Sequence, residues 1–181
     1  MLQDLAVIND QQLTGLVCMN QAQNLRYLGD HEASRIKWYQ ALDHYQNSND
    51  SVPLIRCLEG LVKLRLLDGE VEKAGPDVRR IQNFWLGSGN LREEANAKLL
   101  NGLLECRKGN FGKCIEYATG AFEIHSKIRS QSGKGQSMEL LAKAYAGLEN
   151  WDQALQYYQR SLAELTLGTV SYTHLTLPTK A

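Results

Sequence analysis

Residues 138–162 read MELLAKAYAGLENWDQALQYYQRSL, and this stretch is the clearest guide to the fold. Its first half places apolar side chains at the i, i+3, i+4, i+7 spacing of one helical face: Met138, Leu141, Ala142 and Tyr145. A second apolar stripe follows the turn at 148–150 and consists of Trp151, Ala154, Leu155, Tyr158 and Leu162. The stretch therefore predicts a hairpin of two amphipathic helices.

This hairpin is one copy of a repeat with a period of 40 residues. The turn recurs at four positions: Gly29, Gly69, Gly109 and Glu149. Five residues after each of them comes a small side chain: Ser34, Ala74, Cys114 and Ala154. Small side chains in register let helix backbones approach closely, so we interpret this column as a helix contact.

Turn-forming segments divide the chain into a lead-in at 1–10 and a repeat array at 11–167. The units of the array lie at about 11–50, 51–89, 90–131 and 132–167. Within them, the turn glycines are predicted to take the positive φ that ends a helix. Polar side chains are predicted to cap the helices that follow, at Asp30, Asn90, Asn110 and Asn150, and Glu93 completes a capping-box pattern with Asn90.

Two units depart from this pattern. In the second, we expect Pro76 to delay or kink the start of the second helix, because proline lacks an N–H donor. In the third, strict spacing assigns polar residues or glycine to core columns, at Lys98, Asn101, Gly102 and Glu105. A shift of one residue instead turns Ala97, Leu100 and Leu104 inward, so we expect an extra residue before Gly109.

The predicted architecture is all-α, because period-two alternation of apolar and polar residues is absent over any useful length. Each hairpin alone exposes an apolar face, and stacked hairpins bury these faces in a continuous spine. The fourth unit is expected to leave its outer apolar face uncovered, which favours self-association.

The pattern resembles the tetratricopeptide repeat, and the fourth unit carries the best match, at Leu141, Ala142, Tyr145, Trp151, Ala154, Tyr158, Ser161 and Leu162. Units of 40 residues are longer than usual for that family and resemble the scaffold group that includes LGN and rapsyn. The resemblance implies a right-handed superhelical α-solenoid of about four helix-turn-helix repeats. It also implies that the first helix of each repeat lines a concave surface.

Carried over residue by residue, the resemblance implies ten partner-binding residues: Met19, Gln23, Arg26, Tyr27, Arg56, Glu59, Lys63, Gln136, Glu139 and Lys143. In the third unit only Glu105 or Arg107 is a candidate. The clamp with which some family members grip a chaperone's terminal carboxylate is not reproduced, because its positions hold residues such as Met19 and Glu59. Binding of a chaperone tail is therefore disfavoured.

Glu59 with Lys63, and Glu139 with Lys143, are acid-to-base pairs at i, i+4. Such pairs stabilise an exposed helix by about 0.2–0.5 kcal/mol, and helix support explains them without any ligand. The alternative is a groove that offers both charge signs to an extended or helical peptide.

Composition excludes several classes of partner. The chain has 20 Lys and Arg against 20 Asp and Glu, so it has no basic excess to attract nucleic acid or anionic lipid. No apolar run approaches the roughly 20 residues that span a bilayer, and the start of the chain is unlike a signal peptide. These features predict a cytoplasmic or nuclear protein with no nucleic-acid or membrane partner.

Catalytic chemistry is not predicted. Cys18, Cys57, Cys106 and Cys114 lack CxxC spacing and are interpreted as small buried apolar residues. His31, His44 and His125 lack a metal-binding motif, and no glycine loop matches a phosphate-binding pattern. We therefore expect no enzyme activity, no cofactor and no metal.

The favoured function is a protein–protein interaction scaffold or adaptor that binds a partner peptide or helix on its concave face. The alternative is a truncated regulatory or substrate-docking arm of a larger enzyme. RNA binding by a helical repeat is a weaker third hypothesis, since such repeats have basic concave faces.

Residues 170–181 stand apart, because Val170 to Thr179 resemble the translation of a transposase-type sequencing adapter. We interpret this tail as an artefact, exclude it from fold reasoning, and expect the natural chain to continue beyond Gly168.

Overall fold

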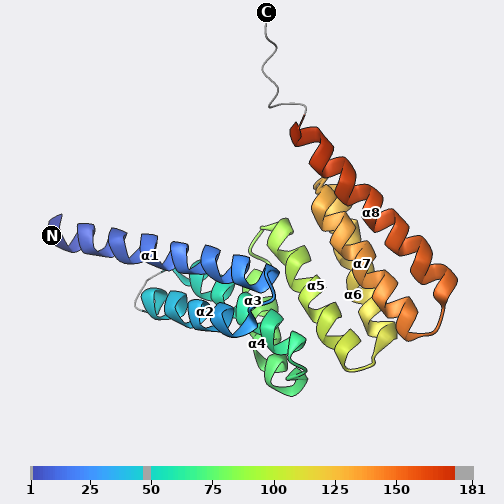
Figure 1. Cartoon of the computed structure of the whole chain (residues 1–181), viewed down its shortest axis with the longest axis horizontal. Helices are drawn as coiled ribbons and strands as arrows, with labels where there is room; N and C mark the ends of the chain where they lie inside the picture. The colour runs from blue at the N-terminus through green and yellow to red at the C-terminus, as the bar shows by residue number, and fades with distance from the viewer. Residues whose placement is uncertain (1, 47–49, 174–181) are drawn as a thin grey trace, which may run out of the picture. The chain divides into compact units, whose positions relative to one another are not determined.

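The computed structural model describes residues 2–46 and 50–173, with side chains at 11–46 and 50–166. Every regular element in this part of the chain is an α-helix (Figure 1). In chain order the helices are α1 (Leu2–Tyr27), α2 (His31–Tyr45), α3 (Ser51–Leu67), α4 (Val71–Trp85), α5 (Leu91–Arg107), α6 (Phe111–Lys127), α7 (Gln131–Gly147) and α8 (Trp151–Thr173). The all-α fold with helical hairpins is confirmed.

The chain divides into two compact units, Met1–Asp77 and Val78–Ala181, with the boundary inside α4. In the first unit α2 packs against both α1 and α3, and α1 also contacts α3. In the second unit α6 packs against α5 and α7, α7 packs against α8, and α5 contacts α7. Each unit thus places the first helices of two successive hairpins side by side, as a helical repeat solenoid does.

The turn column behaves as the repeat predicts. Gly29, Gly69 and Gly109 take φ values of 84°, 79° and 79°, the left-handed conformation that glycine adopts without steric cost. Glu149 occupies the same place with a φ of 60°, which is unusual for a residue with a Cβ atom. The fourth hairpin therefore keeps the turn conformation of the others despite the loss of its glycine.

Three of the four predicted caps form as expected. Asp30 Oδ1 accepts the Ala33 N–H at 3.0 Å, Asn150 Oδ1 accepts the Gln153 N–H at 3.2 Å, and Asn90 Oδ1 accepts the Glu93 N–H at 3.3 Å. The prediction for Asn110 was wrong. Its side chain makes no cap bond, and its Nδ2 donates instead to Glu105 Oε2 at 2.8 Å, since that carboxylate lies across the turn.

The four small residues that recur five positions after each turn are all buried: Ser34, Ala74, Cys114 and Ala154. This burial agrees with their predicted place at helix contacts. Ser34 also donates from Oγ to the Ala22 carbonyl at 2.7 Å, which ties α2 to α1. Burial of the cysteines was predicted correctly for three of them. Cys106 is only half-buried, because it lies near the end of α5.

The third unit keeps the strict 40-residue spacing of the repeat, without a shift of one residue. Ala97, Leu100 and Leu104 are buried as expected, but Asn101 and Gly102 are buried too. Asn101 satisfies its amide by donating from Nδ2 to the Ala97 carbonyl at 2.9 Å, so a polar residue is tolerated at this core column. Helices α5 and α7 both contain 17 residues, and both are followed by a three-residue turn, so the extra residue expected before Gly109 does not exist.

Pro76 does not delay its helix, because α4 already begins at Val71. The preceding residue, Gly75, has no Cβ atom to clash with the proline ring, which relieves the usual conflict before proline. Asp77 forms an ion pair with Arg65 of α3, and this pair fixes the start of α4 beside that helix. The expected delay was therefore wrong.

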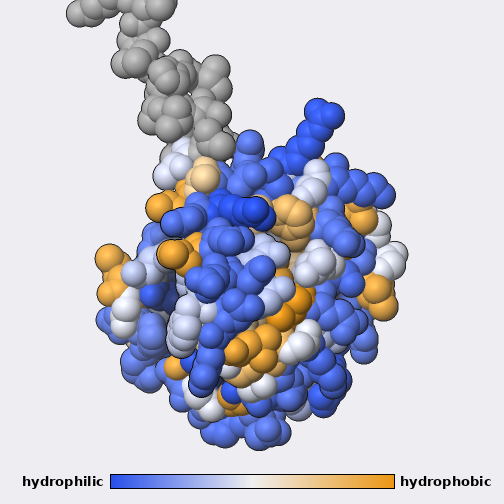
Figure 2. Space-filling view, turned by 90° about the vertical axis from the view of Figure 1, so that its right-hand side faces the viewer, coloured by the Kyte–Doolittle hydropathy of each residue, from blue (hydrophilic) through white to orange (hydrophobic). Residues whose placement is uncertain are grey.

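Helix α8 presents an uncovered apolar stripe. Trp151, Leu155, Tyr158 and Leu162 are all exposed, with exposed fractions between 41% and 66%. Figure 2 shows apolar side chains gathered among polar ones on the face that α8 presents at the right of Figure 1. The expected open face of the fourth unit is confirmed.

The backbone at 170–173 continues α8, and residues 174–181 lie outside the described part of the chain. The adapter interpretation of the tail stays a prediction.

Candidate protein-binding site

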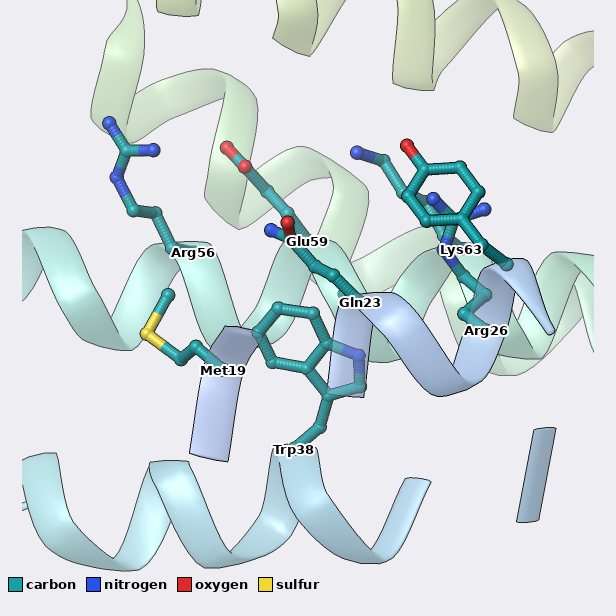
Figure 3. Close-up of a pocket in the computed structure, with 9 residues that line it drawn as sticks. Met19, Gln23, Arg26, Trp38, Arg56, Glu59 and Lys63 are labelled. Carbon is teal, nitrogen blue, oxygen red and sulfur yellow. The ribbon is translucent and has the colours of Figure 1, made fainter. Parts of the chain in front are cut away.

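A hollow with a volume of about 120 Å³ lies between α1 and α3 in the first unit (Figure 3). Residues of α1 and α3 form its walls: Met19, Gln23, Arg26, Tyr27, Arg56, Glu59, Gly60 and Lys63. Trp38 reaches it from α2. Seven of the ten residues chosen from the sequence therefore meet around one hollow. They do so because first helices of successive repeats lie side by side and turn equivalent faces toward each other.

The base of this hollow is the Trp38 indole, which is 2% exposed. Its Nε1–H has no hydrogen-bond partner among the described residues. A buried N–H without an acceptor costs free energy, and native structures normally satisfy such donors. The indole, which lines the hollow, therefore holds a buried and unused donor.

Figure 3 shows the charged side chains spread along the hollow, with Arg56 at one end, Glu59 near the middle and Lys63 with Arg26 at the other. The Arg26 guanidinium lies 4.4 Å from the centre of the Tyr27 ring, a cation–π contact. Three cationic side chains thus face one carboxylate, which gives the hollow a positive excess. The hollow thus carries both charge signs, with positive charge in excess.

Met19 differs from the other six residues chosen from the sequence that line this hollow. Its side chain is 6% exposed and packs in the apolar cluster with Cys18, Ala22 and Trp38. It supplies an apolar wall, whereas Gln23, Arg56 and Lys63 remain exposed to solvent.

The other three chosen residues meet around a second hollow, of about 140 Å³, in the second unit. Gln136, Glu139 and Lys143 come from α7, and Lys143 Nζ lies 2.6 Å from Glu139 Oε1. The remaining lining is apolar: Leu99, Leu103 and Leu140. This hollow also lies between the first helices of two successive hairpins.

Residues 93–163, which span most of α5 to α8, match a family model described as tetratricopeptide repeat. This part of the chain belongs to the tetratricopeptide repeat family. Tetratricopeptide repeats generally mediate protein–protein interactions, and they are typically scaffolds without catalytic activity. No curated protein matches the chain.

The tetratricopeptide hairpin formed by α5 and α6 explains why Glu105 is not a groove residue. Its carboxylate accepts hydrogen bonds from Asn110 at 2.8 Å and Lys108 at 3.2 Å. Burial acts to raise the pKa of Glu105, but these two bonds outweigh it and hold the pKa below its ordinary value. The side chain is committed to its own turn, and Leu99 and Leu103 line the hollow instead.

Sequence reasoning missed Trp38 and Gly60 as members of the first site. The place of Trp38 on a helix-packing face accounts for its buried ring but gives no sign of the unpaired indole N–H. Gly60 adjoins Glu59, and its missing side chain leaves room for that ring. A glycine inside an otherwise apolar helix was the available signal.

Among the described residues, no group of three or more His, Cys, Asp or Glu side chains is arranged to hold a metal ion. In the same part of the chain, no helix has both the length and the apolar character needed to cross a membrane.

Proposed function

We propose that this tetratricopeptide protein is an interaction scaffold that binds an acidic segment of a partner protein in the hollow between α1 and α3. The observation that carries the proposal is the Trp38 indole N–H, which is buried and unpartnered in a residue that lines the hollow together with Arg26, Arg56 and Lys63. An acceptor from the partner would satisfy this donor.

A carboxylate fits the hollow better than a neutral acceptor. Arg26 and Lys63 lie at one end, Arg56 lies at the other, and opposite charges placed across an interface steer association. Glu59 repels a second carboxylate near the middle of the hollow, so it favours one position of the segment over others. The bound segment would be extended or helical, with its acidic side chain directed at Trp38.

The rigid helices favour such binding because little of the groove has to become ordered. Trp38 and Met19 are packed in the core of the first unit, and Arg26 is held over Tyr27. Fewer side chains lose freedom when a partner binds, which lowers the entropic cost of association.

The proposal can be tested with a displayed library of random peptides selected on the whole chain. Acidic peptides should be enriched, and they should bind at least about tenfold more weakly to a chain with Arg56→Glu and Lys63→Glu, equivalent to about 1.4 kcal/mol. Binding should also weaken with added salt, because the charges are exposed.

The matched control carries Lys113→Glu and Lys127→Glu, two exposed changes on α6 that alter net charge by the same amount. Selected peptides should bind this control as they bind the unaltered chain. Enrichment without an acidic bias, or equal weakening by both pairs of changes, would contradict the proposal.

A further inference from the structure

The second hollow is the repeat equivalent of the hollow between α1 and α3, which is called the first hollow below. Its walls stand 80 residues further along the chain, because α5 takes the place of α1 and α7 takes that of α3. Glu139 and Lys143 of α7 correspond to Glu59 and Lys63 of α3. Both hollows therefore have the same construction, and the differences between their residues decide what each can bind.

A large and a small residue exchange places beneath the second hollow. Beneath the first hollow the large residue is Trp38 of α2, which rests on Gly60 of α3. The positions 80 residues later hold Ala118 and Leu140, so here the large side chain comes from α7 and the small one from α6. Leu140 is 6% exposed and packs in one apolar cluster with Ala118. The floor of the second hollow is therefore a leucine side chain, which offers no hydrogen bond to a ligand.

A glycine holds this floor against α5. A Cβ atom on Gly102 would lie 2.8 Å from Leu140 Cδ2, so the missing side chain lets Leu140 rest on the backbone of α5. Leu99 and Leu103 pack against the same apolar cluster and are only partly buried. Leu103 also makes this wall more apolar than its counterpart, since Gln23 holds the equivalent place on α1. Three leucines thus line the hollow, and two of them keep part of their surface open to solvent.

The charges at the rim of the second hollow compensate each other. Lys143 Nζ lies 2.6 Å from Glu139 Oε1, and both side chains are nearly half exposed. The fields of two opposite charges at this distance largely cancel, so the pair attracts a third charge far less than the cationic excess of the first hollow does. Gln136 completes the rim, and its amide can both donate to and accept from a peptide backbone. The rim therefore suits an uncharged stretch of polypeptide.

We propose that the second hollow is a separate partner-binding site, which takes one apolar side chain of leucine or phenylalanine size from a segment of a partner protein. Its volume of about 140 Å³ fits such a side chain, since an enclosed apolar cavity of about 150 Å³ binds benzene. Insertion removes apolar surface of both partners from water, which drives association without any charge. The inference goes beyond the acidic segment proposed for the first hollow and does not depend on it.

Peptide selection tests the proposal on the whole chain. The chain used carries Arg56→Glu and Lys63→Glu, which disable the first hollow, so the result does not depend on whether the first hollow binds acidic segments. Selected peptides should share one large apolar residue, and its replacement by alanine should weaken binding at least about tenfold. Added sodium chloride should not weaken this binding, because no charge carries it. Enrichment of charged peptides without a shared apolar residue would overturn the proposal.

A double variant of the same chain removes the apolar wall. Leu99→Glu with Leu103→Lys copies Glu139 and Lys143, which occupy the equivalent positions of the next repeat, and it leaves net charge unchanged. Because the repeat already accepts this pair of residues, the helix should keep its fold, which circular dichroism would verify. The selected peptides should bind this variant at least about tenfold more weakly.

The matched control reverses the ion pair at the rim. Glu139→Lys with Lys143→Glu keeps both charges and all three leucines, so the affinity of the selected peptides should stay within about twofold. Equal weakening by both double variants would assign the binding to the rim charges and would contradict an apolar anchor. So would full binding by the variant without the apolar wall.

Nuclear magnetic resonance of leucine methyl groups locates the peptide without any change at the second hollow. Methyl resonances of Leu99, Leu103 and Leu140 should shift when a selected peptide is added, whereas those of Leu61 and Leu64 in the first unit should stay in place. Shifts confined to leucines of α8 would place the peptide on the exposed stripe there, and the proposal would be wrong. It would also be wrong if the variant without the apolar wall lost self-association in sedimentation, because the occupant would then be a second copy of the chain.

Discussion

The Trp38 ring occupies the place where a side chain on Gly60 would begin. A Cβ atom built on Gly60 would lie 2.1 Å from Trp38 Cε2, far inside van der Waals contact. The ring therefore rests directly on the backbone of α3. This contact joins the first two hairpins and sets the depth of the hollow above the indole.

Gly60→Ala should consequently disturb both the fold and the site. The added methyl group must displace a ring that is 2% exposed, and overpacking of this kind typically costs about 1–3 kcal/mol, more than the roughly 1 kcal/mol that alanine gains in helix propensity. Urea unfolding followed by tryptophan fluorescence would measure the loss, and binding of selected acidic peptides should fall with it.

Gly120→Ala is the matched control, because a Cβ atom there meets only the Lys98 side chain, at 3.7 Å. Gly120 lies inside α6, and the added methyl group meets no clash there. The substitution should therefore raise the free energy of unfolding by up to about 1 kcal/mol, because alanine favours a helix more than glycine does. Destabilisation by both changes would mean that the Trp38 contact is not the cause.

Trp38→Phe removes the indole N–H and keeps an aromatic ring on Gly60. A hydrogen bond to a charged acceptor contributes about 1.5–3 kcal/mol, so affinity for acidic peptides should fall roughly tenfold or more. In the unaltered chain, the Trp38 indole N–H resonance should move downfield when such a peptide binds. A resonance that stays in place while binding saturates would exclude the proposed hydrogen bond.

His125 should make the fold sensitive to mild acid. Its ring is 1% exposed, and neither nitrogen has a hydrogen-bond partner among the described residues. Burial lowers the pKa of His125, and Arg92 lowers it further. His125 therefore binds a proton more readily in the unfolded chain than in the folded chain. Its contribution to the free energy of unfolding is fully present above about pH 6.5 and is lost as the pH drops below that value.

His125→Leu tests this, because Leu165 occupies the same place in the next repeat. The variant removes two unpaired polar atoms, and we expect it to gain about 1–3 kcal/mol at pH 7. Urea midpoints at pH 7.5 and 5.5 should differ less for the variant than for the unaltered chain. An equal loss in both proteins would assign the acid sensitivity to other groups.

The exposed stripe on α8 should make the chain self-associate. Contiguous exposed apolar side chains of this kind favour association. Sedimentation equilibrium should show a mass that rises with concentration, and Leu155→Glu with Leu162→Glu should abolish the rise. Gln156→Glu with Gln159→Glu adds the same charge beside the stripe and should leave association largely intact. A monomer at every concentration would contradict this expectation.

Much of the fold was predictable from the sequence, because the signals that carry it are local. Gly29, Asp30 and the apolar stripe of residues 138–162 each act within one or two helical turns, so a linear reading locates hairpins and their ends. The residues that line the two hollows come together for the same reason. Repeats place equivalent residues on equivalent faces, and Arg56, Glu59 and Lys63 share one face of α3.

The errors arose where a neighbouring segment decided the outcome. Asn101 is buried because the Ala97 carbonyl satisfies its amide, and Gly75 lets α4 begin before Pro76. Asn110 was expected to cap its own helix, but a carboxylate across the turn engages it. None of these outcomes follows from residue type and spacing alone.

The repeat, the helices and the faces that the helices turn toward one another follow from the sequence alone, since helical periodicity is a property of consecutive residues. The packing of the Trp38 indole on Gly60, and the approach of α5 to α7 around the second hollow, emerged only from the tertiary structure. These contacts depend on distances between different helices, and packing sets those distances.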